Sequence, residues 1–514
     1  MNRIAASAKE LPDSSFLVFI ALPVCYILRG LYLLTDYVNW YALLLIGSVS
    51  WAFGTMHFVL AQMCRKKENC AALFAGITAF LWGINVYLIL HLDFSAATFF
   101  MILSFCLQFF FGKRSIGRNI NMLLLLFFGC AWRYTSPMLV VIISLCLLLR
   151  YWEDKKILFK KALALVLMFL VVWVPILCTL AWYRNVNGYD TYFAYRNAWA
   201  NVIDRQTIDV EAHVKELSEI GFSENDIAMT WRWLIGDTKA FKTENVEELY
   251  EMLPVTDKYN LNILQILILM LKTKWNWLIG FVFLGCLLCV EKEKKTIVLL
   301  AVFTFGLIAG YMVRQRVVER LTLPVYFIGV CFALFVLAEN CNEKVIKLCR
   351  RKLINAVVFG SVALCFVGSC FWAVGFADRV KSINARREAV MQAFEKYTDE
   401  HDSIVLLSGP IGGSPSVPIR ILEKTPEPPV CSSLGGWIYA HPYMNHMMNK
   451  NGLEEYTSQA FCALLLPDVY YVVKNENMVK YIQIFLQEHY GLKTDVEIVQ
   501  QIEGYRLINV LITS

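Results

Sequence analysis

The chain has 514 residues and a formal net charge of +6, and 58% of its residues are hydrophobic while only 18% are charged. Ordinary soluble domains carry about 25% charged residues. This composition, with a mean hydropathy of +0.51, therefore excludes a soluble globular protein. Most of the 16 cysteines lie within apolar runs, which is typical of packed free thiols and argues against a disulfide framework.

Apolar stretches long enough to cross a hydrocarbon core of about 30 Å recur along the first three quarters of the chain. They predict an α-helical polytopic membrane protein with about eleven transmembrane helices, within a transmembrane domain at 1–376. We expect the spans at residues 16–34, 40–62, 71–90, 95–111, 120–132, 137–150, 161–183, 275–290, 296–313, 321–338 and 354–376. The apolar stretch at 260–273 is shorter, and we expect a helix that lies in the interface or re-enters it.

Basic residues concentrate in alternate connections between these spans, beginning with "RKK" at 65–67. The intervening connections "TDYVN" and "HLDFS" contain no Lys or Arg. The positive-inside rule then places the N-terminus in the cytoplasm and the C-terminus outside. The predicted localisation is the cell (plasma) membrane, and the scattered basic residues do not indicate nucleic-acid binding.

Two larger pieces are expected on the outer side. The loop at 184–262 has helical apolar spacing, and "FSEND" offers Ser223 as a helix N-cap. The segment 377–514 begins with a charged helix, "DRVKSINARREAVMQAFEKY", and continues with strand-like "SIVLLS", "DVYYVVK", "VEIVQQIEG" and "YRLINVLI" around a helix "MVKYIQIFLQEHY". Alternating strands and helices predict a small extracytoplasmic α/β domain.

Four arginines fall on the predicted outer side, where topology does not require positive charge. Arg314, Arg316 and Arg320 lie in "RQRVVERLTLP", and Arg133 follows the fifth span. These side chains could reach lipid headgroups or pair with Glu319. Their number favours an anionic ligand instead, because the guanidinium fork fits phosphate and carboxylate.

Two acids also face the outer side. Asp36 follows the first span and Asp93 follows the third. They could supply oxygen ligands for Mg²⁺ or Mn²⁺, or a base for an acceptor hydroxyl, whereas a helix-capping role is the alternative for each. His91 is a candidate proton shuttle or ligand, and a structural role is its alternative.

Outer aromatic residues offer a surface for a sugar. Trp231 and Trp437 could stack on a sugar face, with Asp237 as a polar neighbour, although aromatic side chains in a domain core explain them equally well. His441 and His446 lack companion ligands at metal spacing, so we expect surface histidines.

This layout resembles the GT-C superfamily of membrane glycosyltransferases, in particular the protein mannosyltransferases. The similarity lies in Asp36 as the first-loop acid, Asp93 as the second-loop acid, Arg320 before Pro324 in "RLTLP", and an outer C-terminal domain. Arg133 is similar to a polar residue that ends a middle span. The first outer loop is shorter than in that family, and no W-W-D-x-G motif is present.

The resemblance implies that a sugar is moved from a polyprenyl-phosphate donor to an acceptor glycan, lipid or protein at the outer membrane face. The outer acids would hold a metal or act as base, and the arginines would hold the lipid phosphate. The alternatives are a polymerase, ligase or flippase-type protein of surface-polysaccharide export, and a non-catalytic membrane scaffold that displays its C-terminal domain.

Overall fold

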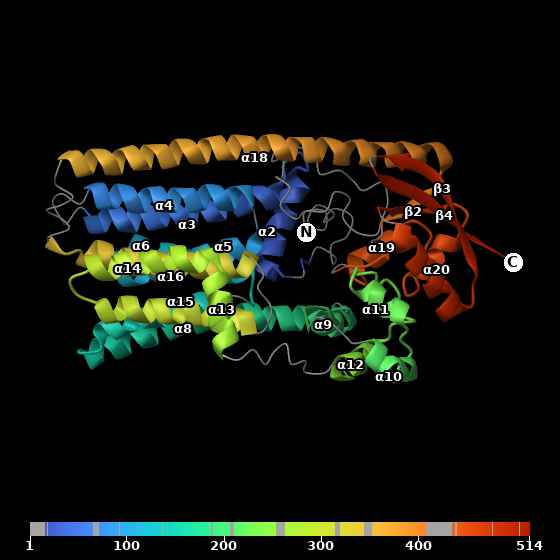
Figure 1. Cartoon of the computed structure of the whole chain (residues 1–514), viewed down its shortest axis with the longest axis horizontal. Helices are drawn as coiled ribbons and strands as arrows, with labels where there is room; N and C mark the ends of the chain where they lie inside the picture. Colours follow the sequence, from blue (N-terminus) through green and yellow to red (C-terminus); the bar gives the residue numbers. More distant parts are fainter. Residues whose placement is uncertain are drawn as a thin grey trace.

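The computed structural model of the chain is elongated, and a helical bundle carries a smaller α/β part at one end (Figure 1). The structure describes residues 16–17, 19–64, 71–91, 93–135, 137–186, 189–205, 210–252, 263–313, 319–343, 352–407, 434–436, 439–474, 476–502 and 504–513. The end of the bundle next to the α/β part is the domain end, and the opposite end is the loop end.

The bundle helices run side by side along the long axis of the molecule (Figure 1). They are α3 (Trp40–Cys64), α4 (Ala71–Leu90), α5 (Phe94–Phe111), α6 (Ile116–Trp132), α7 (Pro137–Leu145) with the 3₁₀ helix η2 (Cys146–Tyr151), α8 (Lys155–Val186), α14 (Lys274–Cys289), α15 (Lys294–Val313), α16 (Glu319–Asn340) and the first half of α18 (Lys352–His401). Two shorter helices, α2 (Leu22–Leu34) and α13 (Ile263–Lys272), lie at the domain end.

Seven helices in the described part of the chain are long and apolar enough to cross a membrane. The number becomes eight if α13 and α14, which meet at 86°, form one broken span. The helix α13 lies where a short interfacial or re-entrant helix was expected, before the span at 275–290. The helix α6 and the stretch Pro137–Tyr151 are apolar but shorter. The helical, multi-pass character is therefore confirmed, whereas the predicted count of eleven spans is not.

The first predicted span, residues 16–34, does not cross the bundle. Before α2, the Ala21 N–H donates to the Ala131 carbonyl at the end of α6 (2.8 Å). After α2, the Asn39 side-chain oxygen accepts from the Tyr32 hydroxyl (3.3 Å), just before α3 begins. Both ends of α2 thus lie at the domain end.

The apolar run is long enough for a span, but part of it packs on protein, whereas Tyr26, Leu33 and Leu34 are 51–78% exposed. Phe16, Leu17, Leu28 and Tyr32 are at most 1% exposed. A sequence pattern cannot distinguish burial by protein from burial by lipid. The side of the membrane that the N-terminus occupies stays a prediction.

Polar contacts hold the loop end together. The connections 112–115, 152–154 and 290–293 lie there, so the basic residues of these predicted cytoplasmic connections share one end. Arg150 is the central residue: it pairs with Glu293 (3.6 Å) and Glu339, and its guanidinium lies 5.0 Å from the Phe111 ring centroid. One side chain therefore joins η2 to the start of α15 and the end of α16.

The helix α18 is one continuous element of 50 residues. The charged helix predicted to open the C-terminal domain is therefore a continuation of the last span rather than a separate element. Within the bundle α18 packs chiefly on α4, and its far end meets the sheet, where Val390 and Phe394 contact Val405, Val472 and Leu507.

The α/β part contains a four-stranded sheet in the order β1-β2-β4-β3, from β1 (Ile404–Leu407), β2 (Val469–Val473), β3 (Thr494–Ile502) and β4 (Tyr505–Ile512). β1 pairs parallel with β2, and the other two pairs are antiparallel. The helix α20 (Glu476–Tyr490) connects β2 to β3. All four strands and α20 fall on the segments predicted for them.

The outer loop is helical, as predicted, and packs on this sheet domain. Its elements are α9 (Tyr189–Arg205), η3 (Glu211–His213), α10 (Val214–Glu219), α11 (Glu224–Thr230) and α12 (Thr243–Met252), and α19 (Pro442–Lys450), η5 (Glu454–Tyr456) and η6 (Cys462–Leu465) precede β2. Trp199 and Phe241 of the loop share one hydrophobic core with Phe485 of α20 and Tyr471 of β2. The described residues of 189–252 and 404–512 therefore form one domain outside the bundle, named the outer domain for that position alone.

Backbone contacts join the two halves of the outer domain. The Gly436 N–H donates to the Trp233 carbonyl (2.9 Å). A Cβ on Gly435 would lie 1.7 Å from that carbonyl oxygen, and a Cβ on Gly236 would lie 2.1 Å from the Leu434 oxygen. Only glycine permits this approach, because any side chain would overlap backbone atoms.

Candidate functional site

Arg133 lies at the domain end, immediately after α6. Its guanidinium donates to the Ser95 hydroxyl and lies 5.9 Å from the Phe19 ring centroid and 5.7 Å from that of Phe94. The side chain is half-buried. It is therefore held at the end of the bundle by α5 and by the segment that precedes α2.

Two further arginines join Arg133 around shared aromatic rings. Arg184, in the last turn of α8, lies 3.7 Å from the Phe193 ring centroid and donates to the Tyr134 hydroxyl (2.5 Å). Arg196, on α9, lies 4.9 Å from the same Phe193 ring and 5.1 Å from Phe19. Since Phe19 also contacts Arg133, two rings connect all three cations into one group, the arginine cluster.

The charges in the arginine cluster oppose one another. Burial lowers the pKa of Arg196, and the positive charge of Arg184 lowers it further, although Tyr192 and Tyr134 act in the other direction. The Arg184 Nε is buried and has no hydrogen-bond partner in the described part of the chain. An anion placed among these groups would relieve the repulsion and accept charge-assisted hydrogen bonds.

The predicted acid Asp93 is connected to the arginine cluster through Ser95. Asp93 is the N-cap of α5, and its carboxylate accepts from the Ser95 N–H (2.8 Å), while the Ser95 hydroxyl accepts from Arg133. Asp93 therefore makes the capping contact that was its alternative role. Asp36 lies half-buried in the turn between α2 and α3, at the same end of the molecule.

His91 lies at the end of α4, packed on α18. Its ring stacks on Tyr87 (4.4 Å between centroids) and contacts Phe376 (4.8 Å) and Trp372 (5.9 Å). One ring nitrogen is bonded to the Tyr87 carbonyl (3.0 Å). These contacts fit the structural role, and the proton-shuttle role stays a prediction.

Three of the four arginines predicted to bind phosphate have side chains outside the described part of the chain. Arg314 and Arg316 lie outside the described residues, and Arg320 lies in the first turn of α16 with a side chain outside the described part. The contribution of these three arginines to phosphate binding stays a prediction.

Of the predicted sugar-binding group, Trp437 lies outside the described residues and Trp231 is 39% exposed. Asp237 is fully buried: its carboxylate accepts from the Ala240 N–H (2.8 Å), the Lys239 N–H (3.1 Å) and the Tyr490 hydroxyl (2.8 Å). Burial raises the pKa of Asp237. Asp237 therefore joins the outer loop to α20 inside the outer domain, and its place in a sugar pocket stays a prediction.

A metal ion could be held in the outer domain by Asp226, Glu488 and His489, whose ligand atoms lie within 4.8 Å of one another. All three already have protein partners: His489 bonds both Asp226 oxygens (3.0 Å), and the Ser223 hydroxyl donates to Glu488 (2.7 Å). Asp36 and Asp93 belong to no such group among the described residues. Metal binding by the predicted acids therefore stays a prediction.

The sequence reading missed three residues of this region. Arg184 and Arg196 were not singled out, although "WYRN" and "AYRN" place each beside aromatic residues. His441, predicted at the surface, is fully buried: its Nε2 is bonded to the Phe16 carbonyl (3.1 Å), and burial lowers its pKa to about 4. The contact with Phe16 connects positions 425 residues apart, which local patterns do not reveal.

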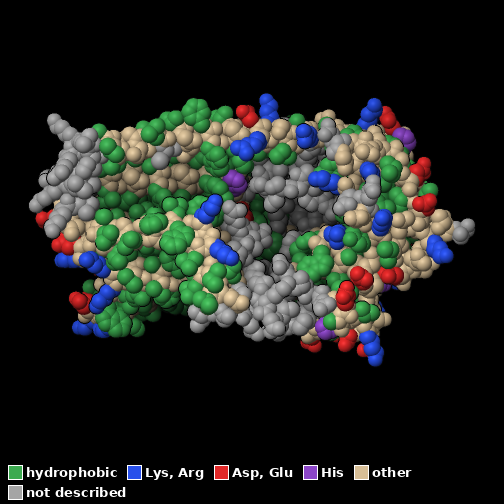
Figure 2. Space-filling view, in the orientation of Figure 1, with side chains coloured by type: hydrophobic (Ala, Val, Ile, Leu, Met, Phe, Trp, Pro, Cys, Tyr) green, Lys and Arg blue, Asp and Glu red, His purple; other side chains and the backbone are tan. Residues whose placement is uncertain are grey.

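An apolar groove of about 400 Å³ follows the bend between α13 and α14 at the domain end. Leu267, Leu271, Trp277 and Phe281 line it, and Asn276 at its base accepts from the Tyr326 hydroxyl. On the face drawn in Figure 2, Lys and Arg side chains lie on the bundle and on the outer domain, on both sides of the region between them.

Comparisons of the chain with protein-family models, with curated proteins and with solved structures find no match.

Proposed function

We propose that this chain is a membrane glycosyltransferase that takes a sugar from a polyprenyl-phosphate donor at the domain end of the bundle. The observation that carries the proposal is the arginine cluster, in which Arg133, Arg184 and Arg196 surround two aromatic rings beneath the outer domain. Three half-buried cations in one place suit a phosphate anion. The apolar groove at the same end offers a surface for an isoprenoid chain.

In this proposal an acceptor hydroxyl attacks the sugar carbon, and the bond from that carbon to the phosphate oxygen breaks. The arginines stabilise the phosphate that leaves. The hydroxyl proton passes to a carboxylate, for which Asp93 is the favoured group because Ser95 connects it to Arg133. The proposal also places the domain end of the bundle on the outside of the cell, as the positive-inside rule predicts.

The test is binding and turnover of polyprenyl-phosphate hexoses by the full chain in lipid nanodiscs, followed through released polyprenyl phosphate. Arg184→Ala should weaken donor binding about 10- to 100-fold, since a charge-assisted hydrogen bond contributes about 1.5–3 kcal/mol. Arg184→Lys should not restore binding, because an ammonium lacks the planar fork. Arg379→Ala, an exposed arginine on α18, is the matched control.

Asp93→Asn separates chemistry from folding. Asparagine caps helices as well as aspartate does, so α5 should keep its start while the carboxylate is lost. Turnover should then disappear with donor binding nearly unchanged. Donor binding that is unaffected in Arg184→Ala, or full turnover in Asp93→Asn, would contradict the respective roles. Binding of lipid-pyrophosphate glycans without any transfer would favour an export protein.

A further inference from the structure

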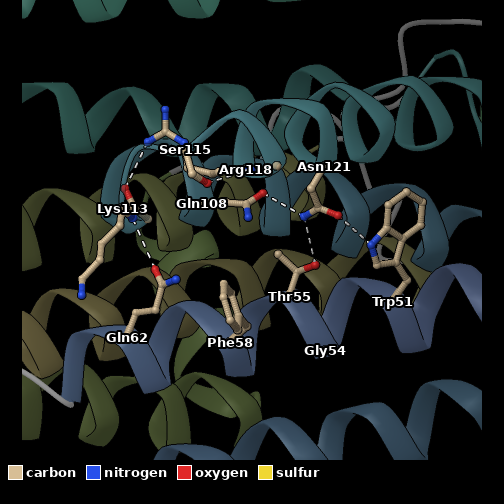
Figure 3. Close-up of a pocket in the computed structure, with 12 residues that line it drawn as sticks. Trp51, Gly54, Thr55, Phe58, Gln62, Gln108, Lys113, Ser115, Arg118 and Asn121 are labelled. Carbon is tan, nitrogen blue, oxygen red and sulfur yellow. Dashed lines mark hydrogen bonds between the residues drawn. The ribbon is translucent and has the colours of Figure 1, made fainter.

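A second site lies at the opposite end of the bundle, in a cavity of about 460 Å³ between α3, α5 and α6 (Figure 3). Its inner part is lined by Trp51, Thr55, Gln108 and Asn121, and its mouth by Lys113 and Arg118. Polar side chains at this depth of a membrane helix are costly unless they serve a purpose. The cavity volume is in the range of small-molecule sites.

A chain of hydrogen bonds fixes the inner wall. Asn121 donates to the Gln108 side-chain oxygen (2.9 Å) and to the Thr55 hydroxyl (3.3 Å), and its own oxygen accepts from Trp51 Nε1 (2.9 Å). These contacts position Gln108, which is only 4% exposed (Figure 3). In the described part of the chain, the Gln108 amide nitrogen has no hydrogen-bond partner. The amide borders the cavity without being sealed from it, so a ligand oxygen that enters the cavity can accept a hydrogen bond from it.

The charge of the cavity favours an anion. Its lining contains Lys113 and Arg118 and no Asp or Glu. Arg118 is fixed by donation to the Gly112 carbonyl (3.1 Å) and to Asn119 (2.9 Å). The Lys113 side chain is exposed and makes no ion pair with any residue that the structure describes. A phosphate group at the mouth would meet both cations.

The cavity also opens to the lipid side of α3. Phe58 is 58% exposed there, and Gly54 is an exposed glycine with nothing within 4 Å of an added Cβ. An amphipathic ligand can therefore enter between the helices with its chains left in the bilayer. This entry favours a lipid over a soluble anion.

We propose that this cavity binds the phosphate-bearing headgroup of an anionic phospholipid from the leaflet at the loop end. The phosphate lies against Lys113 and Arg118, and headgroup oxygens accept from the Gln108 amide. The site is separate from the arginine cluster and does not depend on the transferase proposal.

The test is native mass spectrometry of the full chain in nanodiscs titrated with phosphatidylglycerol or phosphatidylcholine. Gly54→Leu fills the cavity and should weaken phosphatidylglycerol binding at least tenfold. Gly47→Leu, two turns earlier on the same exposed face of α3 and outside the cavity, should not. Lys113→Glu, a surface change that leaves the helices intact, should weaken binding several-fold and tests the site even if Gly54→Leu fails to fold.

Unchanged phosphatidylglycerol affinity in Gly54→Leu or in Lys113→Glu would overturn the proposal. Equal affinity for phosphatidylcholine would overturn the preference for an anionic headgroup. In a final experiment, soluble glycerol 3-phosphate is added to the chain in phosphatidylcholine discs. If it saturates the site at the concentrations that suffice for phosphatidylglycerol, the ligand is a soluble anion and the lipid proposal is overturned. Weak or absent binding of glycerol 3-phosphate supports the lipid as the ligand.

Discussion

Replacement of His489 by alanine should loosen the outer domain at the contact between its two halves. His489 on α20 bonds both carboxylate oxygens of Asp226 on α11 at 3.0 Å, and Asp226 is fully buried. Removal of one partner of a buried pair costs about 3–5 kcal/mol, because a charge is left uncompensated. His489 is 17% exposed, and Asp226 still accepts the hydrogen bond from the Ser223 N–H in the variant. We therefore expect His489→Ala to lower the free energy of unfolding of the outer domain by about 2–4 kcal/mol.

The contribution of this pair depends on pH. Burial alone would lower the pKa of His489, but the hydrogen bond and charge of Asp226 outweigh it, so the pKa lies above the ordinary value of 6.5. A raised histidine pKa means that the folded state binds the proton more tightly than the unfolded state. The His489–Asp226 pair therefore makes its full contribution to the stability of the outer domain below about pH 6.5. This contribution is lost as the pH rises through the pKa of His489 in the folded state.

Hydrogen exchange of the full chain in nanodiscs, followed in peptides from α11 and α20, measures this effect. At pH 6 the expected loss of stability corresponds to about 30- to 700-fold faster exchange of these peptides in His489→Ala. After correction for intrinsic rates, wild-type protection of these peptides should fall as the pH is raised above 6.5, and the variant should show no such fall. His446→Ala is the control, as a half-buried histidine of the same domain. Equal protection of α11 and α20 in wild type and His489→Ala at pH 6 would refute the reasoning.

Three further changes test the packing. Gly435→Ala places a Cβ 1.7 Å from the Trp233 oxygen, so limited proteolysis should show a strongly destabilised outer domain, whereas an unaltered cleavage pattern would contradict the backbone contact. Ser223→Ala removes the capping box of α11 and should cost about 1 kcal/mol, measured as faster exchange in that helix and, through the lost bond to Glu488, in α20. Arg150→Ala removes the ion pairs to Glu293 and Glu339 and should lower the thermal unfolding temperature in detergent, and an unchanged temperature would show that these contacts contribute little.

Local patterns predicted those elements whose formation depends on local sequence. The strands at 404–407 and 505–512 follow from short β-branched and aromatic runs between breakers. Ser223 caps α11 with Asp226 as its reciprocal partner, a four-residue pattern that needs no tertiary information. The long apolar helices were equally visible from their composition.

Long-range packing determined what the sequence reading missed. The run at 16–34 resembles a span in composition, yet both ends of α2 lie at the domain end and residues such as Phe16 and Tyr32 are buried by protein. Arg184 and Arg196 stand 12 residues apart on two helices, and only the Phe193 ring between them shows that they belong to one group. Asp237 was read as a candidate pocket residue because exposure cannot be read from an isolated aspartate, and Tyr490, its partner, is 253 residues away.

The 50-residue helix α18 gives the molecule a rigid shaft about 75 Å long. Its far end is fixed to the sheet by Val390 and Phe394, while its membrane half touches mainly α4 and otherwise faces outward. Helices adjust their tilt to the thickness of the bilayer. A tilt of about 5° would swing the sheet end by about 6 Å. A change in bilayer thickness would thereby change the position of the outer domain relative to the arginine cluster.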